Sequence, residues 1–353
     1  HIALLGAANS IHLQRWALAL AARGRRVSLI TQHAREALPL PAAIELVPLP
    51  WRGPLAYALN ARALRRWLAR ERPALLHAHY ASGYGTLARL GGCASVPTLL
   101  SVWGSDVYDF PRQGALARRT LLRNLAHADA LASTSQAMAR QVRKLWPAAP
   151  PIAITPFGVD MRAFAPQPAE AVPTSTSSPS SPCRDRDRDA VLTIGTVKTL
   201  AAKYGIDTLL HAFAALSAQR GEALPRLELL IVGDGPDAAA LKRLADDLQL
   251  GQRVRWIGAV AHAEVPAWLR RLDIYVAASR LDSESFGVAV VEAMACAVPV
   301  VVSDAGGLPE VVGGDEGAAR CGLVVPRDDP AALATALGTL IDDLVADYRE
   351  RGK

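Results

Sequence analysis

Apolar runs alternate with helical patterns along the chain, and this alternation constrains the fold more than any other feature. In the first part of the chain the apolar runs are Ile2–Leu5, Val27–Thr31, Leu75–Ala78, Thr98–Val102, Ala130–Ser133 and Ile152–Thr155. The helical patterns between them include Ile11–Arg23, Ala61–Arg70 and Leu116–Ala126. Strands that alternate with helices predict a parallel sheet that helices cover on both faces. The turn after the first run begins at Gly6, which is small enough to let a ligand approach the backbone beside a helix N-terminus, as in a Rossmann-like domain.

A second series of apolar runs predicts a second sheet of similar size. Its runs are Val191–Ile194, Leu227–Val232, Val254–Ile257, Ile274–Ala277, Val298–Val302 and Gly322–Val325. A chain of 353 residues suits two domains of roughly 150 residues each. We therefore expect an α/β protein of two Rossmann-like domains, whose parallel sheets face each other across a cleft that binds ligands.

The composition changes abruptly between the two series. Residues 166–189 are rich in Pro, Ser and Thr and end in alternating charges, so they have too little apolar surface to fold. We expect an N-terminal domain at 1–165, a flexible linker at 166–189 and a C-terminal domain at 190–343. The last residues, 344–353, are expected to form a terminal helix that follows missing residues near Asp343.

The charge of the chain is distributed unevenly. The first 150 residues carry a net charge of +13 and the rest carry −7, which gives +6 for the whole chain. A basic first half favours an anionic partner, which could be nucleic acid, a membrane surface or a phosphorylated substrate.

The spacing of the cysteines indicates the redox environment of the protein and disfavours a metal site. Cys93, Cys183, Cys296 and Cys321 lie far apart and form no C-x-x-C pair. This spacing is untypical of a zinc site or a disulfide framework and suits a reducing cytoplasm. No apolar run is long enough to span a bilayer, and no signal peptide is visible.

Two carboxylates lie near an expected helix start in the second domain. If the helix begins at Ser285 or Phe286, Glu284 lies just before it and Glu292 nearly two turns within it. Helical side chains lean toward the N-terminus, so both carboxylates can reach the space at the helix start. The backbone amides expected to face that space belong to Ser285, Phe286, Gly287 and Val288. These groups suit a ligand that combines a diphosphate with hydroxyl groups.

A simpler interpretation is that Glu284 caps the helix and Glu292 forms a surface ion pair. Against it, Glu292 lies within Val288–Ala297, where nearly every other residue is apolar. A carboxylate buried there needs a partner, which favours a binding role for the two glutamates together.

This segment resembles the E-x7-E signature of family 4 of the retaining glycosyltransferases, which have the two-domain GT-B fold. Further matching motifs follow in order through most of the second domain. They are IVGDGP at Ile231–Pro236, VRWIGAV at Val254–Val260, VPAWLRRLDIYVAASR at Val265–Arg280 and GGLPEVV at Gly306–Val312. Several specific motifs in a fixed order make the resemblance strong.

The resemblance implies roles for residues of a donor site. Glu284 would contact the transferred sugar, Glu292 the nucleotide ribose, and the backbone at Phe286 and Gly287 the phosphate and sugar. A basic pair would neutralise the diphosphate. In the loop GTVKTLAAKYGIDTLL, Thr196 stands where the family usually has Arg, and Lys198 and Lys203 keep the expected five-residue separation. We assign the role to these two lysines, although two exposed surface lysines would give the same sequence pattern.

Three further residues are candidates in the second domain. Gly233 lies in a turn that either shapes the sheet or meets the donor. Trp256 and Gly258 lie where the nucleotide base packs in the family, although a lone Trp at a strand end is also typical of a core.

The first domain resembles the family less closely. Its matching segments are His77–Tyr80, Ser101–Asp106 and Thr155–Asp160. Many members have a His where Trp103 stands, and Trp cannot relay a proton. His79, His12 and Asp106 remain candidates for contacting the sugar or the acceptor hydroxyl, with a purely structural role as the alternative for each.

The basic residues of the first domain favour a membrane surface as a partner. Arg and Trp gather around one expected helix, at Trp51, Arg52, Arg62, Arg65, Arg66, Trp67 and Arg70. Arg and Trp beside Leu suit anionic lipid headgroups, while a solvated helix face is the alternative. No recognition motif supports nucleic acid.

The resemblance, together with these features, implies a metal-independent retaining glycosyltransferase without a cofactor. It would move a sugar from an NDP-sugar, UDP- or GDP-linked, to a hydroxyl of a saccharide or lipid-linked saccharide in cell-surface polysaccharide assembly. The expected location is the cytoplasm, with peripheral association at the inner face of the membrane. A sugar-nucleotide 2-epimerase and a non-catalytic sugar-nucleotide-binding relative remain alternatives. A nicotinamide oxidoreductase is disfavoured because Gly6 is not followed by G-x-x-G and Thr31 is not followed by an acid for the ribose.

Overall fold

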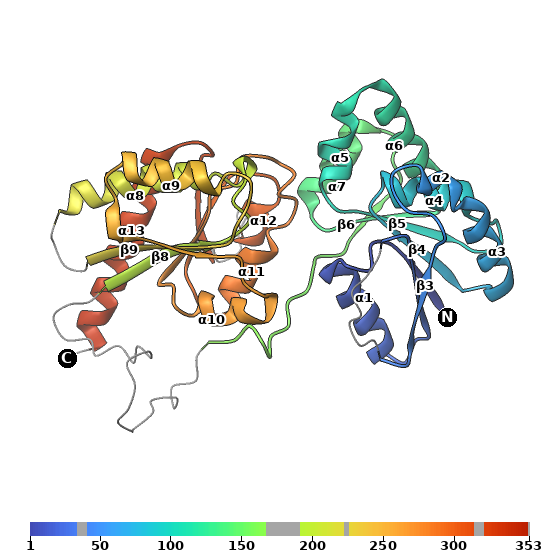
Figure 1. Ribbon diagram of the computed structural model, residues 1–353, viewed down its shortest axis with the longest axis horizontal. Coiled ribbons are helices and arrows are strands. Elements are labelled where there is room, and N and C mark those ends of the chain that lie inside the picture. The colour runs from blue at the N-terminus through green and yellow to red at the C-terminus, as the bar shows by residue number, and fades with distance from the viewer. Residues whose placement is uncertain (34–40, 167–190, 222–225, 314–320, 352–353) are drawn as a thin grey trace. The chain divides into compact units, whose positions relative to one another are not determined.

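The chain forms two compact units, His1–Gly158 and Val159–Lys353, in the computed structural model (Figure 1). The structure describes residues 1–33, 41–166, 191–221, 226–313 and 321–351, with side chains described up to residue 346. The expected linker, 166–189, lies outside the described residues except for Pro166. Among the residues described, no helix has the length and apolar character needed to span a membrane.

The first unit is built on a seven-stranded parallel sheet. Its strands are β1 (Ile2–Leu5), β2 (Val27–Thr31), β3 (Ile44–Pro48), β4 (Leu75–His79), β5 (Thr98–Val102), β6 (Ala130–Ser133) and β7 (Ile152–Ile154). The strand order is β3-β2-β1-β4-β5-β6-β7, which is the order of a Rossmann sheet with a seventh strand added. The sequence patterns did not predict β3, which is an edge strand with one buried residue, Ile44.

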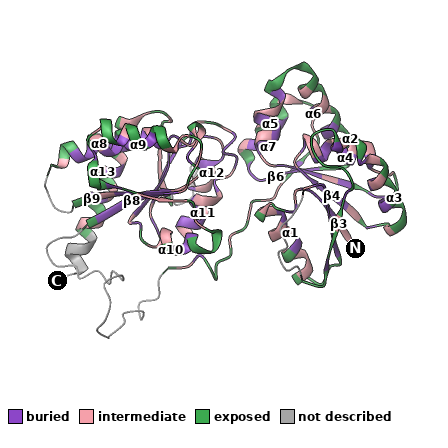
Figure 2. Ribbon diagram, viewed as in Figure 1, coloured by how far each residue is buried: buried purple, intermediate pink, exposed green. Residues whose placement is uncertain are grey.

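Helices cover both faces of this sheet. They are α1 (Ile11–Ala22), α2 (Ala56–Leu59), α3 (Ala61–Glu71), α4 (Gly83–Gly91), α5 (Ser105–Tyr108), α6 (Ala115–His127) and α7 (Gln136–Leu145). Helix α1 packs Leu13 and Ala17 against Leu4 of β1. Leu5, the next residue of the strand, points to the opposite core, which α3, α4, α6 and α7 cover. The central strands are therefore buried while the helices keep an outer exposed side (Figure 2).

The second unit repeats the plan with six parallel strands. They are β8 (Val191–Val197), β9 (Arg226–Val232), β10 (Val254–Gly258), β11 (Ile274–Ala277), β12 (Val300–Ser303) and β13 (Gly322–Val325), in the order β10-β9-β8-β11-β12-β13. One core lies under α8 (Ile206–Arg220), α9 (Ala238–Asp247) and α13 (Pro330–Arg351). The other lies under α10 (Val265–Leu269), α11 (Val288–Ala295) and α12 (Leu308–Val311). The predicted α/β class with two Rossmann-like parallel sheets is confirmed.

Two domain limits differ from the expectation. The boundary lies at Gly158, because the side chain of Phe164 is buried in the core of the second unit and Arg270 donates hydrogen bonds to Ala163 O and Ala165 O. At the other end, α13 runs without interruption from Pro330 to Arg351, so no separate terminal helix begins at residue 344.

One residue of the expected membrane surface is misplaced. Trp67 lies on the buried side of α3 and is only 7% exposed, so it packs in the core and cannot contact lipid. The arginines at positions 62, 65, 66 and 70 are exposed as expected.

Candidate active site

The strand order of the second sheet reverses between β8 and β11. Open parallel sheets bind ligands at the carboxyl ends of their strands at such a point. Lys198 follows β8, and the loop after β11 carries Glu284. Lys198 Nζ donates to Glu284 Oε1 at 3.0 Å, with only 15% and 10% of the two side chains exposed. The structure thus brings together two residues that the sequence assigned to one donor site from positions 86 residues apart.

Lys198 keeps its positive charge in this buried place. Burial is the largest single effect and lowers the pKa of its ammonium group, but Glu284, Tyr275 and Tyr204 together outweigh burial and hold the pKa above its ordinary value. The site therefore presents a fixed cation at the edge of the sheet.

Lys203 joins Lys198 through an aromatic ring. Lys203 lies in the short 3₁₀ helix η2 (Ala202–Tyr204), and its Nζ is 4.7 Å from the centroid of the Tyr204 ring. The Nζ of Lys198 lies at the same distance from that centroid. The two predicted lysines therefore share one ring, a contact that the sequence analysis did not identify.

The helix with the second carboxylate begins later than predicted. Helix α11 begins at Val288, and Gly287 precedes it with a left-handed φ of +83°. The prediction of a start at Ser285 or Phe286 is wrong, because only a residue without Cβ adopts this conformation easily. Ser285 and Phe286 therefore belong to the preceding loop.

Glu292 is buried within α11 and has a histidine partner. Its side chain is 7% exposed, and its Oε1 lies 3.1 Å from His262 Nε2. His262 belongs to η4 (His262–Glu264), just after the carboxyl end of β10. Sequence reasoning missed His262, although a His after a strand's carboxyl end is a signal that could have pointed to it.

A glycine pair supports the loop that carries Glu284. Gly307 N donates to Glu284 O at 3.0 Å. A Cβ added at Gly306 would lie 2.3 Å from Glu284 O, and one at Gly307 would lie 2.2 Å from Ser285 O. Only glycine allows this close approach of two backbones, which fixes the loop at the donor site.

An arginine that the sequence analysis also missed ties this loop to the residue that follows β12. Arg327 donates to Asp282 Oδ1 at 2.8 Å and to Asp304 Oδ1 at 2.9 Å. Asp282 Oδ1 in turn accepts from Gly306 N at 3.2 Å. The loop before Glu284 is therefore held by ion pairs and hydrogen bonds together.

The structure separates the roles of Gly233, Gly258 and Trp256. Gly233 has φ +139°, and a Cβ there would lie 1.9 Å from Lys198 O, so this glycine shapes the Lys198 loop. Gly233 N donates to Gly258 O at 2.8 Å. Trp256 packs on the core beneath α9 with Lys242 Nζ 5.9 Å from its ring centroid, which favours the core interpretation over contact with a base.

The first sheet reverses its strand order between β1 and β4, where Gly6 and His79 lie. His79 is 1% exposed, and its ring centroid is 3.9 Å from that of His77. Within the described residues neither ring nitrogen of His79 has a hydrogen-bond partner, while His77 Nε2 pairs with Ser101 Oγ at 2.7 Å. Buried polar groups without partners are rare in folded proteins and cluster at functional sites.

An aromatic cluster surrounds His79. His12 stacks on Phe157 with ring centroids 4.1 Å apart, and Trp103 packs edge-on to Phe157 at 5.5 Å. The ring of Trp103 is also 5.3 Å from that of His79. The predicted candidates His12 and His79 therefore both lie next to the ring of Trp103, and Phe157 joins them as a residue that sequence reasoning missed.

Asp106 is placed as an organiser of loops. It is fully buried, and its carboxylate accepts hydrogen bonds from Ala81 N at 2.7 Å, Gly104 N at 2.8 Å and Trp103 N at 3.1 Å. Burial raises the pKa of Asp106, and these backbone donors oppose the rise. The geometry favours its structural role, holding the loops after β4 and β5, over contact with a substrate.

Acid should destabilise the first unit through the histidine pair. Burial lowers the pKa of His77 to about 4, and burial together with His77 holds the pKa of His79 well below its ordinary value. In the unfolded chain both histidines take up protons near pH 6.5, so above that pH the neutral pair makes its full contribution to the free energy of unfolding. Below pH 6.5 that contribution falls by about 1.4 kcal/mol per pH unit for each histidine.

The loss for His77 should end near pH 4, where the folded protein also takes up the proton. Urea unfolding monitored by Trp fluorescence measures this loss of stability, because five of the seven tryptophans lie in the first 158 residues. A matched His77→Gln variant should show a shallower decline between pH 6.5 and 4. Equal slopes in both proteins would contradict the assignment.

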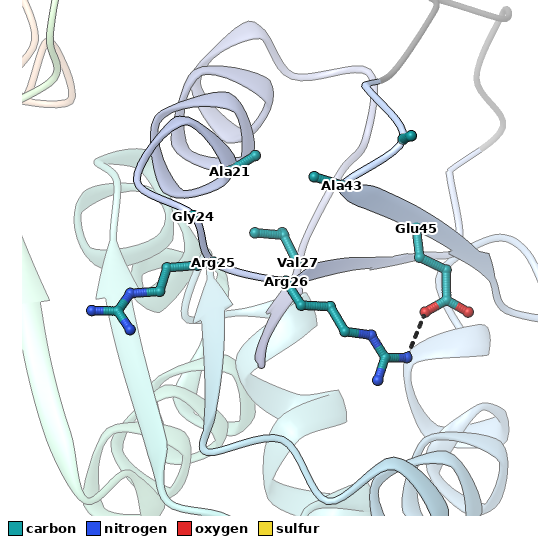
Figure 3. A pocket seen from close by; sticks show the side chains of 8 residues that line it. Ala21, Gly24, Arg25, Arg26, Val27, Ala43 and Glu45 are labelled. Atoms are coloured by element: carbon teal, nitrogen blue, oxygen red, sulfur yellow. Dashed lines mark ion pairs between the residues drawn. The ribbon is translucent and has the colours of Figure 1, made fainter.

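A pocket of about 420 Å³ lies elsewhere in the first unit (Figure 3). It is lined by Ala21, Gly24, Arg25, Arg26, Val27, Ala42, Ala43 and Glu45. Val27 is the first residue of β2, so the pocket lies at the amino ends of the strands, opposite the edge where such sheets bind ligands. Arg26 is already paired with Glu45 at 3.6 Å and Glu71 at 3.1 Å, so the pocket is not a candidate for the donor.

Comparison with known proteins gives two family matches. The family described as glycosyl transferases group 1 matches residues 187–353, and the one described as glycosyl transferase 4-like matches residues 1–135. The D-inositol 3-phosphate glycosyltransferase 2 of Catenulispora acidiphila is 31% identical over 80% of this chain and 62% of its own length. The D-inositol 3-phosphate glycosyltransferase of Kineococcus radiotolerans is 34% identical over 61% of this chain and 50% of its own length. The chain thus spans between half and two thirds of the length of these curated relatives.

Solved structures show the same fold. Sucrose-phosphate synthase from Thermosynechococcus elongatus has a TM-score of 0.74 at 22% identity, covering 97% of this chain and 90% of its own. Anabaena HepE has a TM-score of 0.71 at 20% identity with the same coverage of both chains. The predicted GT-B fold and the resemblance to family 4 are thereby confirmed. The second domain therefore matches the glycosyl transferases group 1 family, and the first domain matches the glycosyl transferase 4-like family.

Proposed function

We propose that this protein is a retaining glycosyltransferase that takes a sugar from a nucleoside diphosphate sugar. The observation that carries the proposal is the buried pair of Lys198 and Glu284, which lies where the strand order of the second sheet reverses. Lys203 contacts the same aromatic ring as Lys198. The two family matches support the proposal, and so do curated relatives that are named as glycosyltransferases.

The arrangement suits the chemistry of a departing diphosphate. Negative charge grows on the diphosphate as its bond to the sugar breaks, and fixed cations aimed at that charge lower the barrier. Lys198 and Lys203 supply the cations, Glu284 accepts hydrogen bonds from sugar hydroxyls, and Glu292 accepts them from the ribose. The leaving diphosphate can take the proton of the acceptor hydroxyl on the same face, so retention needs no protein nucleophile.

The proposed reaction needs no metal ion, because the lysines provide the positive charge. In the described parts of the chain, no three His, Cys, Asp or Glu side chains group closely enough to hold one. A transfer rate that is unchanged by a chelator is the outcome that this part of the proposal requires.

UDP- and GDP-linked sugars are the donor classes to test. Anabaena HepE was solved in complex with UDP-glucose, and one relative from Corynebacterium glutamicum, 31% identical over 64% of this chain, is named a GDP-mannose-dependent mannosyltransferase. The acceptor we propose is a hydroxyl of a saccharide or a lipid-linked saccharide. The cluster of Trp103, Phe157 and His12 supports it, because aromatic faces bind the apolar faces of sugar rings.

A membrane-facing surface fits a lipid-linked acceptor. Trp51 is 56% exposed, Leu55 80% and Leu59 56%, and they immediately precede the exposed arginines of α3. Apolar side chains beside arginines suit the boundary of an anionic bilayer. We therefore propose a cytoplasmic enzyme that associates peripherally with the membrane.

A donor panel tests the function and separates the alternatives. The protein is incubated with UDP- and GDP-sugars, with and without free saccharides or a lipid extract. A transferase forms product only with an acceptor, an epimerase changes the donor alone, and a non-catalytic relative binds the donor without turnover.

The site variants Glu292→Ala and Lys203→Ala should each weaken donor binding and transfer about tenfold or more, since each removes a charged contact. Titration calorimetry with the nucleoside diphosphate and a product assay measure the two effects. Unchanged transfer in both variants would overturn the site assignment.

A further inference from the structure

The ring of Tyr204 contacts both cations of the candidate donor site. The Nζ atoms of Lys198 and Lys203 each lie 4.7 Å from the centroid of its ring, within the range in which an aromatic face attracts a cation. Lys198 has Glu284 as an anionic partner. The ring of Tyr204 is thus a contact that both ammonium groups have in common.

Two ammonium groups held near one point repel each other, and the repulsion grows as solvent is excluded. The negative face of an aromatic ring offsets part of this repulsion without neutralising either charge. Lys198 is already paired with Glu284, so a second carboxylate in place of the ring would leave no net positive charge for a diphosphate. A tyrosine ring therefore suits a site that must keep two cations ready for an anion.

The backbone around Tyr204 is fixed from several sides. Arg280 N donates to Lys203 O at 2.8 Å, and the guanidinium of Arg280 reaches Asp207 Oδ2 at 2.6 Å. Gly205 follows with φ +61°, and a Cβ there would lie 2.0 Å from Ala278 O. The ring of Tyr204 packs on the core beneath α8. The ring is therefore held by its surroundings and can hold the lysines in turn.

The sequence of the loop explains why its lysines need a group that positions them. Thr196 stands where the family usually has Arg, so the loop lacks a guanidinium that could bind a phosphate through two hydrogen bonds. Lysine is a flexible point charge and depends on its surroundings for direction. In this chain the ring supplies that direction.

We propose that Tyr204 is a positioning residue, whose ring holds Lys198 and Lys203 in the geometry that binds the diphosphate of the donor. The inference rests on the proposed function and adds a residue that does not itself touch the donor. Its ring, and not its hydroxyl, is the part that acts.

The test compares Tyr204→Phe with Tyr204→Leu. The full chain is titrated calorimetrically with UDP and with GDP. For the nucleotide that the wild type binds more tightly, Tyr204→Leu should lower the affinity about three- to thirtyfold, which is the range for a lost cation–aromatic contact. Phe should retain most of the affinity because it keeps the ring. In the transfer assay the Leu variant should raise KM for the donor more than it lowers kcat. Thermal unfolding identifies a variant that has lost its fold, in which case Tyr204→Met takes the place of Leu.

A second comparison asks whether Tyr204 acts through the lysines. In a Lys203→Met background one of its two cations is gone, so Tyr204→Leu should weaken binding by a smaller factor than in the wild-type chain. An equal factor in both backgrounds, or a Leu variant that binds like the wild type, would overturn the inference. A wild-type chain that binds neither UDP nor GDP would instead overturn the proposed function.

Discussion

Replacing Lys198 by Met should lower the rate of sugar transfer by a factor of about 100 to 1000. This is the range for removing one fixed group that stabilises charge in a transition state. Lys198 is almost buried, and Glu284 together with Tyr275 and Tyr204 keeps its ammonium group charged, so little water can take the place of that group. Steady-state kinetics with the donor found in the panel measure the loss.

The same substitution should also destabilise the second domain, because it leaves the carboxylate of Glu284 buried without its cation. Breaking one side of a buried ion pair costs about 3 kcal/mol or more. Glu284→Gln should cost a comparable amount by leaving Lys198 alone. The double variant Lys198→Met, Glu284→Gln removes both charges and should regain much of the stability.

Activity should not follow stability in that series. If Lys198 serves the reaction, the double variant stays as inactive as Lys198→Met although it unfolds at a higher denaturant concentration. A double variant that recovered both stability and transfer would show that Lys198 serves only to neutralise Glu284.

Most of the fold was accessible from the sequence because buried parallel strands are short, almost wholly apolar runs between turn residues. Strand β11, Ile274–Ala277, has all four residues buried and was predicted with its correct limits. Strand β3 was missed for the opposite reason: it lies at the edge of its sheet, reads IELVP and buries only Ile44. An edge strand lacks the second buried face that makes a central strand recognisable.

The candidate site was accessible only in part, because its contacts join distant segments. Glu284, Glu292, Lys198 and Lys203 could be named from motifs. His262 lies 30 residues before its partner Glu292, and no local spacing reveals such a pair. The start of α11 was misjudged because the sequence does not show that Gly287 takes a left-handed φ. The packing of both lysines on Tyr204 depends on the course of η2, which also cannot be read from a pattern.

Gly233→Ala should destabilise the protein by at least about 3 kcal/mol, whereas Gly258→Ala should cost only about 1–2 kcal/mol. Both glycines have a positive φ, +139° and +83°, so both substitutions strain the backbone. Only at Gly233 does an added Cβ also collide, at 1.9 Å from Lys198 O, while at Gly258 no heavy atom lies within 4 Å. Urea unfolding of the two variants side by side measures the difference.

The collision also predicts a loss of donor binding that Gly258→Ala should not share. Lys198 N donates to Val232 O at 2.9 Å, so the carbonyl that must move belongs to a residue anchored beside Gly233. Moving that carbonyl turns the Lys198 side chain away from Glu284 and Tyr204, the two groups that direct it. We expect Gly233→Ala to bind UDP or GDP at least tenfold more weakly, a difference of about 1.4 kcal/mol. Equal stability and equal affinity in the two alanine variants would mean that Gly233 does not shape the Lys198 loop. Weaker binding at unchanged stability would instead place Gly233 in contact with the donor.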